Sequence, residues 1–393
     1  MQEPLSAGKR KASEKDVWEQ DRRHHLHPFQ NFKSYDEAGS LVLSEGKGCW
    51  LTDVDGKRYF DAVGGMWCTN LGLGRQEMAD VIAEQVMALN YGNPFTDMSN
   101  EPAAKLAAKL AELAPGDLNH TFFTCGGSTA NDAAYRLIQM YQGARGKKNK
   151  KHVICRHDAY HGTTYLAASL SGKAGDRMPD FEYITDGIHH LTSPNYYRAP
   201  EGLSESEFCD YLVDELRQKI LELGPDNVAA FFAEPILGSG GVIVPPEDYN
   251  RRTWELCREH DILYVADEVV TAFGRLGHWF VSKDMFDIEP DIITCAKGLT
   301  SAYLPLGAMI VSDRIYDVLG NDADRWFTAG FTYSAHPVCC AAALKNIEIL
   351  EREKIFDNVR EVGAYFEEQL HTLLDLPIVG DIRGRLFMMC VVN

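Results

Sequence analysis

The stretch Asp291-Ile-Ile-Thr-Cys-Ala-Lys-Gly298 decides the fold, together with an earlier stretch, Ile262-Leu-Tyr-Val-Ala-Asp-Glu268. Each contains a short apolar run of the length and composition typical of a strand buried inside a sheet. One strand delivers Lys297 at its end, and the other delivers Asp267. A lysine alone at a strand end is usually a solvated terminus, whereas an acid strand and a lysine strand together indicate a shared site.

Helical patterns alternate with further apolar runs around these two strands. We expect helices over 76–90, 101–113, 129–142, 204–223 and 247–260, and strands over 121–124, 152–155, 229–233, 262–266, 291–295 and 306–311. Strands that alternate with helices of this length predict a mainly parallel sheet with helices on both faces. The fold class is therefore α/β.

Other patterns flank this region on both sides. A hairpin is predicted over 49–61, with its turn at Asp55-Gly56. Helical patterns cover 337–352 and 354–374, and strands are expected around Arg383-Gly384. We expect a flexible arm over 1–22, a large domain over 72–330, and a smaller α+β domain built from 23–71 and 331–393.

Composition limits the function classes. The 393 residues carry a formal net charge of −18, with 45% hydrophobic and 24% charged residues, which is typical of a soluble enzyme. An acidic surface argues against nucleic acid or an anionic membrane as partner, and we expect the basic run 147–151 to be a solvated loop. No apolar run approaches the ~20 residues that span a bilayer. Ten scattered cysteines, without a C-x-x-C pair or a signal peptide, predict a cytoplasmic protein.

The segment Thr124-Cys-Gly-Gly-Ser-Thr129 links a predicted strand to a predicted helix. Gly126 and Gly127 allow a tight turn and a close approach of the backbone to a ligand, and Ser128 can cap the helix. A helix N-terminus attracts anions, so the segment can cradle a phosphate. It is equally compatible with a plain strand-to-helix turn.

Four further positions admit two interpretations each. Tyr160, beside Gly162, can stack on a flat ring or belong to the core. Glu234 can face the ligand crevice at the carboxyl edge of the sheet or be a solvated strand end. Thr332 can donate to a phosphate or cap a turn. His24-His-Leu-His27 can ligate a metal, but histidines near a terminus are more often surface or interface residues, so no metal site is expected.

Asp267 and Lys297 have a sharper chemical logic. A buried carboxylate keeps a pyridine nitrogen protonated, because opposite charges stabilise each other in a low-dielectric site, and a protonated ring is a better electron sink. Burial and a cationic neighbour lower a lysine pKa from about 10.4 and permit imine formation. Val269 shares the face of Asp267 and can pack on the ring, whereas Glu268 points away. The acid, the lysine and the phosphate-type loop together suit pyridoxal 5′-phosphate (PLP).

From about Asp21 to the end, the chain resembles the class III (omega) aminotransferases, which are fold type I PLP enzymes. The resemblance is carried by the segments His24-His-Leu-His-Pro-Phe29, Gly65-Met-Trp67, Cys125-Gly-Gly-Ser-Thr-Ala-Asn-Asp132, Tyr160-His-Gly162, Ala233-Glu-Pro235, Asp267-Glu-Val269, Ala296-Lys-Gly298, Leu304-Pro-Leu-Gly307 and Phe331-Thr-Tyr-Ser334. Within the family it is most similar to enzymes that pass an amino group from an omega-amino acid or amine to pyruvate, such as beta-alanine:pyruvate and taurine:pyruvate aminotransferases.

The resemblance implies a role for each matching residue. Lys297 is the Schiff-base lysine and Asp267 the partner of the pyridine nitrogen. Tyr160 and Val269 would lie on the two faces of the ring, and Glu234 would lie near it. Gly127 and Ser128 would bind the phosphate, and Trp67 would line the substrate pocket. Thr332 would reach the phosphate from the neighbouring subunit of a homodimer or dimer of dimers. The implied reaction is transamination between a small amine donor and a keto-acid acceptor.

Two other classes of function stay open at this point. One is another PLP reaction on the same scaffold, such as that of an aminomutase, a decarboxylase or a racemase. The other is a truncated, non-catalytic homologue that acts by dimerisation.

The sequence departs from the family pattern at two places. Thr129 stands where the family usually has glutamate, and we expect altered support of the phosphate loop without loss of binding. The chain ends on the apolar run Leu386–Asn393, whereas family members continue into a segment with an arginine for the substrate carboxylate. Arg383 lies too early to match that arginine. From this ending we expect a truncated small domain and poor turnover of carboxylate acceptors.

Overall fold

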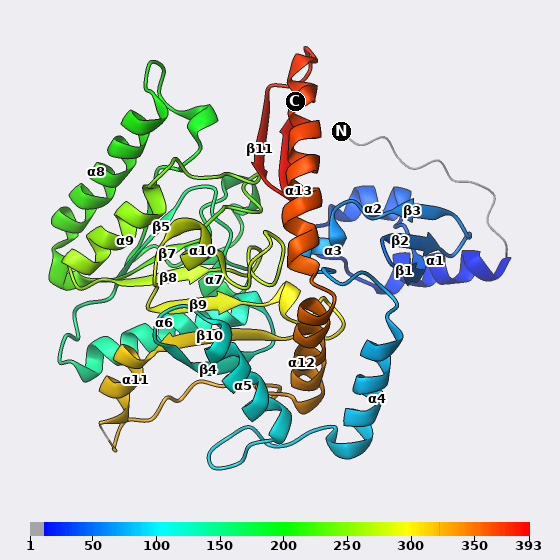
Figure 1. Cartoon of the computed structure of the whole chain (residues 1–393), viewed down its shortest axis with the longest axis horizontal. Helices are drawn as coiled ribbons and strands as arrows, with labels where there is room; N and C mark the ends of the chain where they lie inside the picture. The colour runs from blue at the N-terminus through cyan, green and yellow to red at the C-terminus, as the bar shows by residue number, and fades with distance from the viewer. Residues whose placement is uncertain (1–11, 322) are drawn as a thin grey trace.

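The computed structural model describes residues 12–321 and 323–393. Its centre is a seven-stranded sheet in the order β4-β10-β9-β8-β7-β5-β6 (Figure 1). The strands are β4 Leu118–Thr124, β5 His152–Arg156, β6 Ile188–Leu191, β7 Val228–Ala233, β8 Leu263–Asp267, β9 Ile292–Cys295 and β10 Gly307–Ser312. Strand β10 runs antiparallel to β4 and β9, and the pairs from β9 through β8, β7 and β5 to β6 are parallel. The predicted mainly parallel sheet is confirmed.

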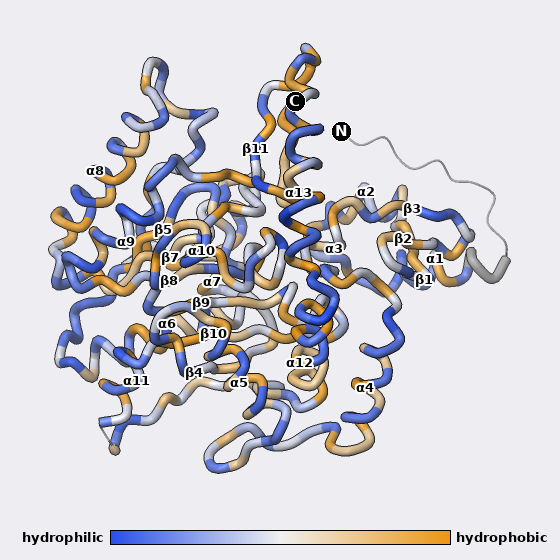
Figure 2. The backbone as a smooth tube through the Cα atoms, in the orientation of Figure 1, coloured by the Kyte–Doolittle hydropathy of each residue, from blue (hydrophilic) through white to orange (hydrophobic). Residues whose placement is uncertain are grey.

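Helices cover both faces of this sheet. One face packs against α5 Glu101–Leu113, α8 Glu205–Leu223, α9 Tyr249–Glu259 and α12 Pro337–Arg352, and the other against α6 Gly127–Ala144, α7 Tyr165–Leu170 and α11 Asp313–Gly320. Neighbouring strand residues enter opposite cores: Phe231 lies in the first and Phe232 in the second. Both faces need apolar residues, so the strands are continuous apolar runs, and Figure 2 shows hydrophobic colour gathered along the central strands.

The remaining elements surround the large sheet. Helix α4 Gln76–Leu89 packs beside α12, and α10 Val281–Phe286 follows β8. The predicted hairpin is present as β2 Trp50–Asp53 and β3 Arg58–Phe60, which β1 Leu43–Lys47 extends to three strands. Helix α13 Ile355–His371 and the short helix η5 Thr372–Asp375 lead to the antiparallel pair β11 Asp381–Arg385 and β12 Met388–Val392. The helix predicted over 354–374 is thus divided in two.

Strand β6 was not predicted. Its sequence, Ile-His-His-Leu, has apolar residues only at its ends, so the sequence lacks the continuous apolar run of the other strands. The strand forms because it pairs in parallel with β5 at the edge of the sheet. The short helices α2 Phe32–Ala38 and α3 Gly64–Trp67 were also not predicted.

The N-terminal segment differs from the expected loose arm. Residues 12–22 form most of helix α1 Ala12–His24, while residues 1–11 lie outside the described residues. The helix is fixed because Arg22 donates to the backbone oxygen of Asp36 at 2.6 Å and Asp21 accepts a hydrogen bond from Tyr35 at 2.6 Å. Both contacts join α1 to α2, so the position of α1 depends on residues that lie outside the predicted arm.

The basic run 147–151 is also not wholly solvated. Lys150 is buried, and its ammonium group donates to the backbone oxygen of Pro225 at 2.8 Å. Lys147 lies 2.8 Å from a carboxylate oxygen of Asp261. The prediction of a solvated loop is therefore wrong at Lys150. The sequence does not show this, because the backbone oxygens that accept hydrogen bonds from its ammonium group belong to distant segments. Among the described residues, the search for a helix long and apolar enough to cross a membrane found none.

Candidate active site

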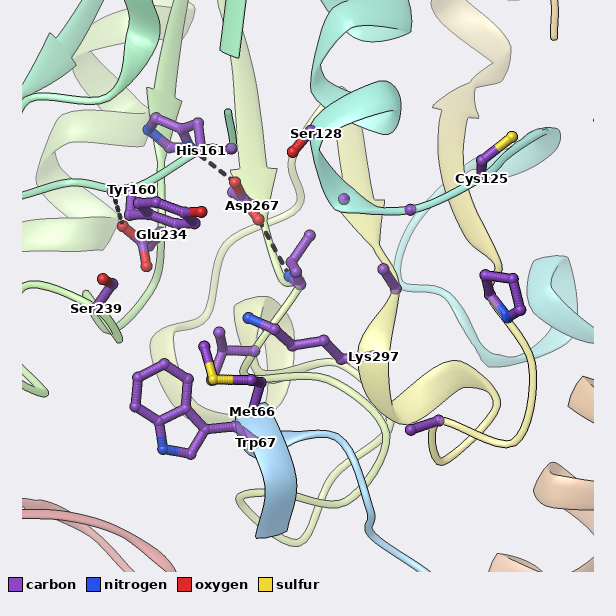
Figure 3. A pocket seen from close by; sticks show the side chains of 18 of the residues that line it. Met66, Trp67, Cys125, Ser128, Tyr160, His161, Glu234, Ser239, Asp267 and Lys297 are labelled. Atoms are coloured by element: carbon purple, nitrogen blue, oxygen red, sulfur yellow. Dashed lines mark hydrogen bonds and ion pairs between the residues drawn. The ribbon is translucent and has the colours of Figure 1, made fainter. Parts of the chain in front are cut away.

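A cavity of about 640 Å³ lies where strands β7, β8 and β9 end, next to the N-terminus of α6 (Figure 3). This volume is in the range of small-molecule and cofactor sites. Residues from eight separate segments line it. They include eight of the nine predicted site residues: Trp67, Gly127, Ser128, Tyr160, Glu234, Asp267, Val269 and Lys297. The sheet brings these residues together because the carboxyl ends of its parallel strands share one edge.

Asp267 is the last residue of β8, and its carboxylate is buried and fixed from several sides. Asn131 Nδ2 donates to Oδ2 at 2.8 Å, and His161 Nδ1 lies 2.7 Å from the same oxygen. The backbone N–H of Val269 donates to Oδ1 at 3.1 Å. An ionised carboxylate only accepts hydrogen bonds, so His161 carries its proton on Nδ1 and donates it to Asp267.

Asn131 and His161 are site residues that the sequence analysis did not select, although both lie inside quoted motifs. Asn131 is held in one orientation, because its Nδ2 also donates to the backbone oxygen of His161 at 2.8 Å and its Oδ1 accepts from Thr294 at 2.9 Å. The signals that could have found them are the motif positions 125–132 and 160–162. Nothing in the sequence pairs either residue with Asp267.

Lys297 opens the short helix η4 Lys297–Leu299, directly after β9, with a positive φ of 41°. Its side chain reaches into the pocket, and Nζ lies 5.5 Å from the centroid of the Trp67 ring (Figure 3). Burial lowers the pKa of Lys297 below the ordinary lysine value, although the charges of Asp267 and Glu234 act in the opposite direction. A lowered pKa increases the fraction of free amine, which is the nucleophilic form.

Glu234 lies at the end of β7 and is buried rather than solvated. Its two oxygens accept hydrogen bonds from the backbone N–H groups of Tyr160 and Gly238, each at 2.9 Å. Burial raises the pKa of Glu234 above its ordinary value. The carboxylate therefore fixes the backbone that carries Tyr160, whose side chain lines the pocket (Figure 3).

The start of α6 has the geometry of an anion cradle. A Cβ added to Gly127 would lie 2.9 Å from Val269, and a Cβ on Gly162 would lie 2.2 Å from Ser128 Oγ, so the backbone here is close-packed. Ser128 Oγ accepts from the backbone N–H of Thr163 at 3.2 Å, which leaves its own proton to donate. The first N–H groups of a helix have no acceptor within the helix, and Gly126, Gly127 and Ser128 at the start of the 18-residue helix α6 line the pocket.

Thr129 and Thr332 complete the comparison with the predicted site. Thr129 Oγ1 donates to the backbone oxygen of Gly126 at 2.9 Å, so this residue supports the glycine turn in place of the family glutamate. Thr332 is exposed and does not line the pocket of its own chain. Its backbone oxygen accepts from Tyr91 at 3.0 Å.

These residues fit PLP by the chemistry of three separate anchors. A buried carboxylate held by Asn131 and His161 suits a pyridinium nitrogen, a glycine-walled helix N-terminus suits a phosphate, and a half-buried lysine of lowered pKa suits a carbonyl carbon. The three anchors are Asp267, the Gly126–Ser128 segment and Lys297, and all line one pocket.

Comparison with known proteins decides the family. The sequence profile described as "Aminotransferase class-III" matches residues 33–393. The chain is a class III aminotransferase. This confirms the resemblance drawn from the motifs, and with it the fold type I architecture, PLP as cofactor and transaminase chemistry.

Individual relatives agree with this assignment. The putrescine–pyruvate aminotransferase of Pseudomonas aeruginosa is 42% identical over 365 residues, which cover 92% of this chain and 79% of that protein. A mitochondrial gamma-aminobutyrate transaminase 1 of Oryza sativa subsp. indica is 39% identical over 363 residues, covering 91% and 70%. The structure of an (S)-enantioselective omega-transaminase from Thermomicrobium roseum superposes with a TM-score of 0.93 at 40% identity, covering 98% of this chain and 85% of that one. An omega transaminase from Pseudomonas jessenii, solved in complex with PMP, gives 0.91 at 38% identity, covering 94% and 82%.

Proposed function

We propose that this class III aminotransferase moves an amino group from a primary amine or omega-amino acid to pyruvate or a similar keto acid. The observation that carries the proposal is that Lys297 and the buried Asp267 line one pocket. The named activities of its relatives, putrescine–pyruvate and gamma-aminobutyrate transamination, support an amine at the end of an aliphatic chain as donor.

Each residue has a part that follows from its surroundings. When bound, PLP supplies a carbonyl carbon that condenses with amines and a ring that accepts electrons. Lys297 Nζ holds the cofactor and is placed to take and return a proton, since burial favours its neutral amine. Asp267, oriented by Asn131 and His161, presents a fixed negative charge to the ring nitrogen.

The other predicted residues bind and orient. Tyr160 and Val269 bound the ring, with Glu234 fixing the backbone of Tyr160. Gly127 and Ser128 bind the phosphate at the α6 N-terminus. Trp67 lies against the amine of Lys297 and therefore contacts the substrate.

We also propose a homodimer in which Thr332 completes the phosphate site of the partner subunit. The exposure of Thr332, outside its own pocket, supports this arrangement. Exposed aromatic side chains near Thr332, those of Tyr91, Phe95 and Tyr333, supply surface that an interface would bury. Free cysteines throughout the described residues support a reducing, cytoplasmic location.

The test of function is amino transfer with purified protein, PLP, pyruvate and a set of amine donors that includes putrescine and gamma-aminobutyrate. We expect alanine to form in step with the aldehyde or keto product of the donor. Lys297→Ala is the matched control for background reaction. Without a keto acid, the donor can form product only up to the amount of PLP present, because its amino group stays on the cofactor. Product that exceeds the PLP without a keto acid, as in decarboxylation or racemisation, would overturn the proposal, and so would the absence of alanine from a protein that retains bound PLP.

A further inference from the structure

Two histidines of the N-terminal motif meet a carboxylate at the end of α1. His25 Nδ1 lies 3.1 Å from Asp21 Oδ1, and His27 Nε2 lies 3.1 Å from both oxygens of the same carboxylate. The three groups offer ligand atoms that all lie within 4.8 Å of one another. The sequence analysis interpreted these histidines as surface or interface residues, because it did not connect them with Asp21.

The carboxylate of Asp21 is oriented by two hydroxyl groups. Tyr35, which is 7% exposed, donates to Oδ2 at 2.6 Å, and Ser40 donates to the same oxygen. Because Oδ2 receives both hydroxyls, Oδ1 remains to face the two rings as an anionic donor atom. Metal sites commonly hold a ligating carboxylate by such outer hydrogen bonds.

The spacing of the ligand atoms suits a small transition-metal ion. Bond lengths of about 2.0–2.1 Å to nitrogen and oxygen in a tetrahedral site place the ligand atoms roughly 3.3 Å apart. The two Asp21–histidine separations are 3.1 Å, so coordination would need only small side-chain shifts. The alternative is a metal-free arrangement in which both imidazole rings donate an N–H hydrogen bond to the Asp21 carboxylate. The two states differ in where the ring protons lie.

Access and charge also favour an ion. The side chain of His25 is 64% exposed and that of His27 is 26% exposed, so an ion can enter from solvent and keep an open coordination position. Two arginines follow Asp21, and both face carboxylates. Arg22 lies 3.3 Å from Asp36 and 3.7 Å from Glu19, and Arg23 lies 3.1 Å from Glu19, so these carboxylates partly offset the two positive charges.

We propose that Asp21, His25 and His27 form a binding site for a divalent transition-metal ion of the Zn²⁺, Co²⁺ and Ni²⁺ class. Imidazole nitrogens select these ions, whereas Ca²⁺ and Mg²⁺ prefer sites built of oxygen alone. The site lies outside the pocket around Lys297, and none of its three residues lines that pocket.

The ion would join the end of α1 to the segment that follows it. Phe29 lies two residues after His27 and lines the active-site pocket, with a positive φ of 53°. Fixing His27 therefore fixes the backbone that carries Phe29 to the pocket mouth. The proposal does not depend on the identity of the amine donor, since it concerns ligand atoms outside the reaction site.

The test uses untagged, PLP-loaded protein that has been stripped with chelator and dialysed into phosphate-free buffer. Co²⁺ is titrated while the visible d–d absorption of tetrahedral Co²⁺ is followed, and Zn²⁺ is then added to displace it. Cys49→Ser serves as the background chain, because Cys49 is exposed and a thiolate would also bind these ions. We expect saturable binding of a single ion per chain and a higher melting temperature with Zn²⁺.

Variants separate the site from general histidine binding. His25→Ala, His27→Ala and Asp21→Asn should each abolish the tetrahedral spectrum, and Tyr35→Phe should weaken binding by ~10–100-fold, as loss of an outer hydrogen bond does at other metal sites. His24→Ala is the matched control, because His24 is exposed and neighbours His25 but is not part of the cluster. The PLP absorbance of each variant reports that it has folded.

Three results would overturn the proposal. They are an absence of Co²⁺ and Zn²⁺ binding by the parent chain, equal binding by the parent chain and folded His27→Ala, or a loss in His24→Ala as large as that in His25→Ala. Amino transfer could persist in all three cases, so failure here is distinguishable from failure of the proposed function.

Discussion

Replacing Asp267 by asparagine tests how the pocket sustains its chemistry. The carboxylate accepts from Asn131 and His161 on Oδ2 and from the backbone N–H of Val269 on Oδ1. An asparagine has one acceptor oxygen. If it faces Asn131 and His161, its NH₂ group faces the N–H of Val269, and two donors oppose each other.

Two separate costs follow. The lost hydrogen bond at Val269 lowers the free energy of unfolding by about 1–3 kcal/mol. The lost charge removes the group that we propose keeps the ring nitrogen protonated, and we expect kcat to fall by at least ~100-fold, about 2.7 kcal/mol in the activation barrier. Only the lost charge is expected to change kcat; the lost hydrogen bond changes stability.

Glu268→Gln separates the two costs. Glu268 is fully buried, as Asp267 nearly is, but it does not line the pocket, and it accepts from the backbone N–H groups of Val281 and Ser282 and from the Thr271 hydroxyl. A glutamine there also sets donor against donor, so the melting temperature should fall as it does in Asp267→Asn, while kcat stays within a few-fold of the parent value.

The assay is amino transfer to pyruvate under saturating donor and PLP, with thermal unfolding measured on the same preparations. Equal losses of kcat in the two variants would refute the assignment of Asp267 as the charge behind the ring. A normal kcat in folded Asp267→Asn would refute it equally.

Three further outcomes are expected. Lys297→Ala should lose at least ~99% of turnover, because we propose that the residue both holds the cofactor and moves the proton. Borohydride reduction of the parent should label only the peptide with Lys297, and residual activity of the variant well above ~1% would contradict this role. The rate at which apoenzyme takes up PLP should rise with pH, with a midpoint below 10.5, because burial lowers the pKa of Lys297. The midpoint should fall further in Asp267→Asn, since the Asp267 charge raises that pKa. A midpoint at or above 10.5 in the parent would contradict the burial argument. Thr332→Ala should weaken PLP retention with little change in the far-ultraviolet spectrum, and an active monomer in sedimentation at micromolar concentration would refute a shared site.

The sequence by itself determined six of the seven strands of the large sheet and the choice of candidate residues at its edge. The apolar runs that end at Ala233, Ala266 and Ala296 are local signals, because a strand buried on both faces needs mostly apolar residues along its length. A functional residue placed directly after such a run reaches the sheet edge whatever the strand order is. Lys297, Asp267 and Glu234 could therefore be chosen from the sequence.

Tertiary structure alone decided which side chains support them. Asp267 contacts Asn131 and His161 only because β8, the α6 N-terminus and the loop after β5 converge at one edge of the sheet, and the sequence does not give the strand order. The same holds at the N-terminus, where Tyr35 fixes the carboxylate of Asp21. Such contacts join segments that propensity and periodicity treat separately, because a hydrogen bond depends on where two segments meet in space and not on the local pattern of either.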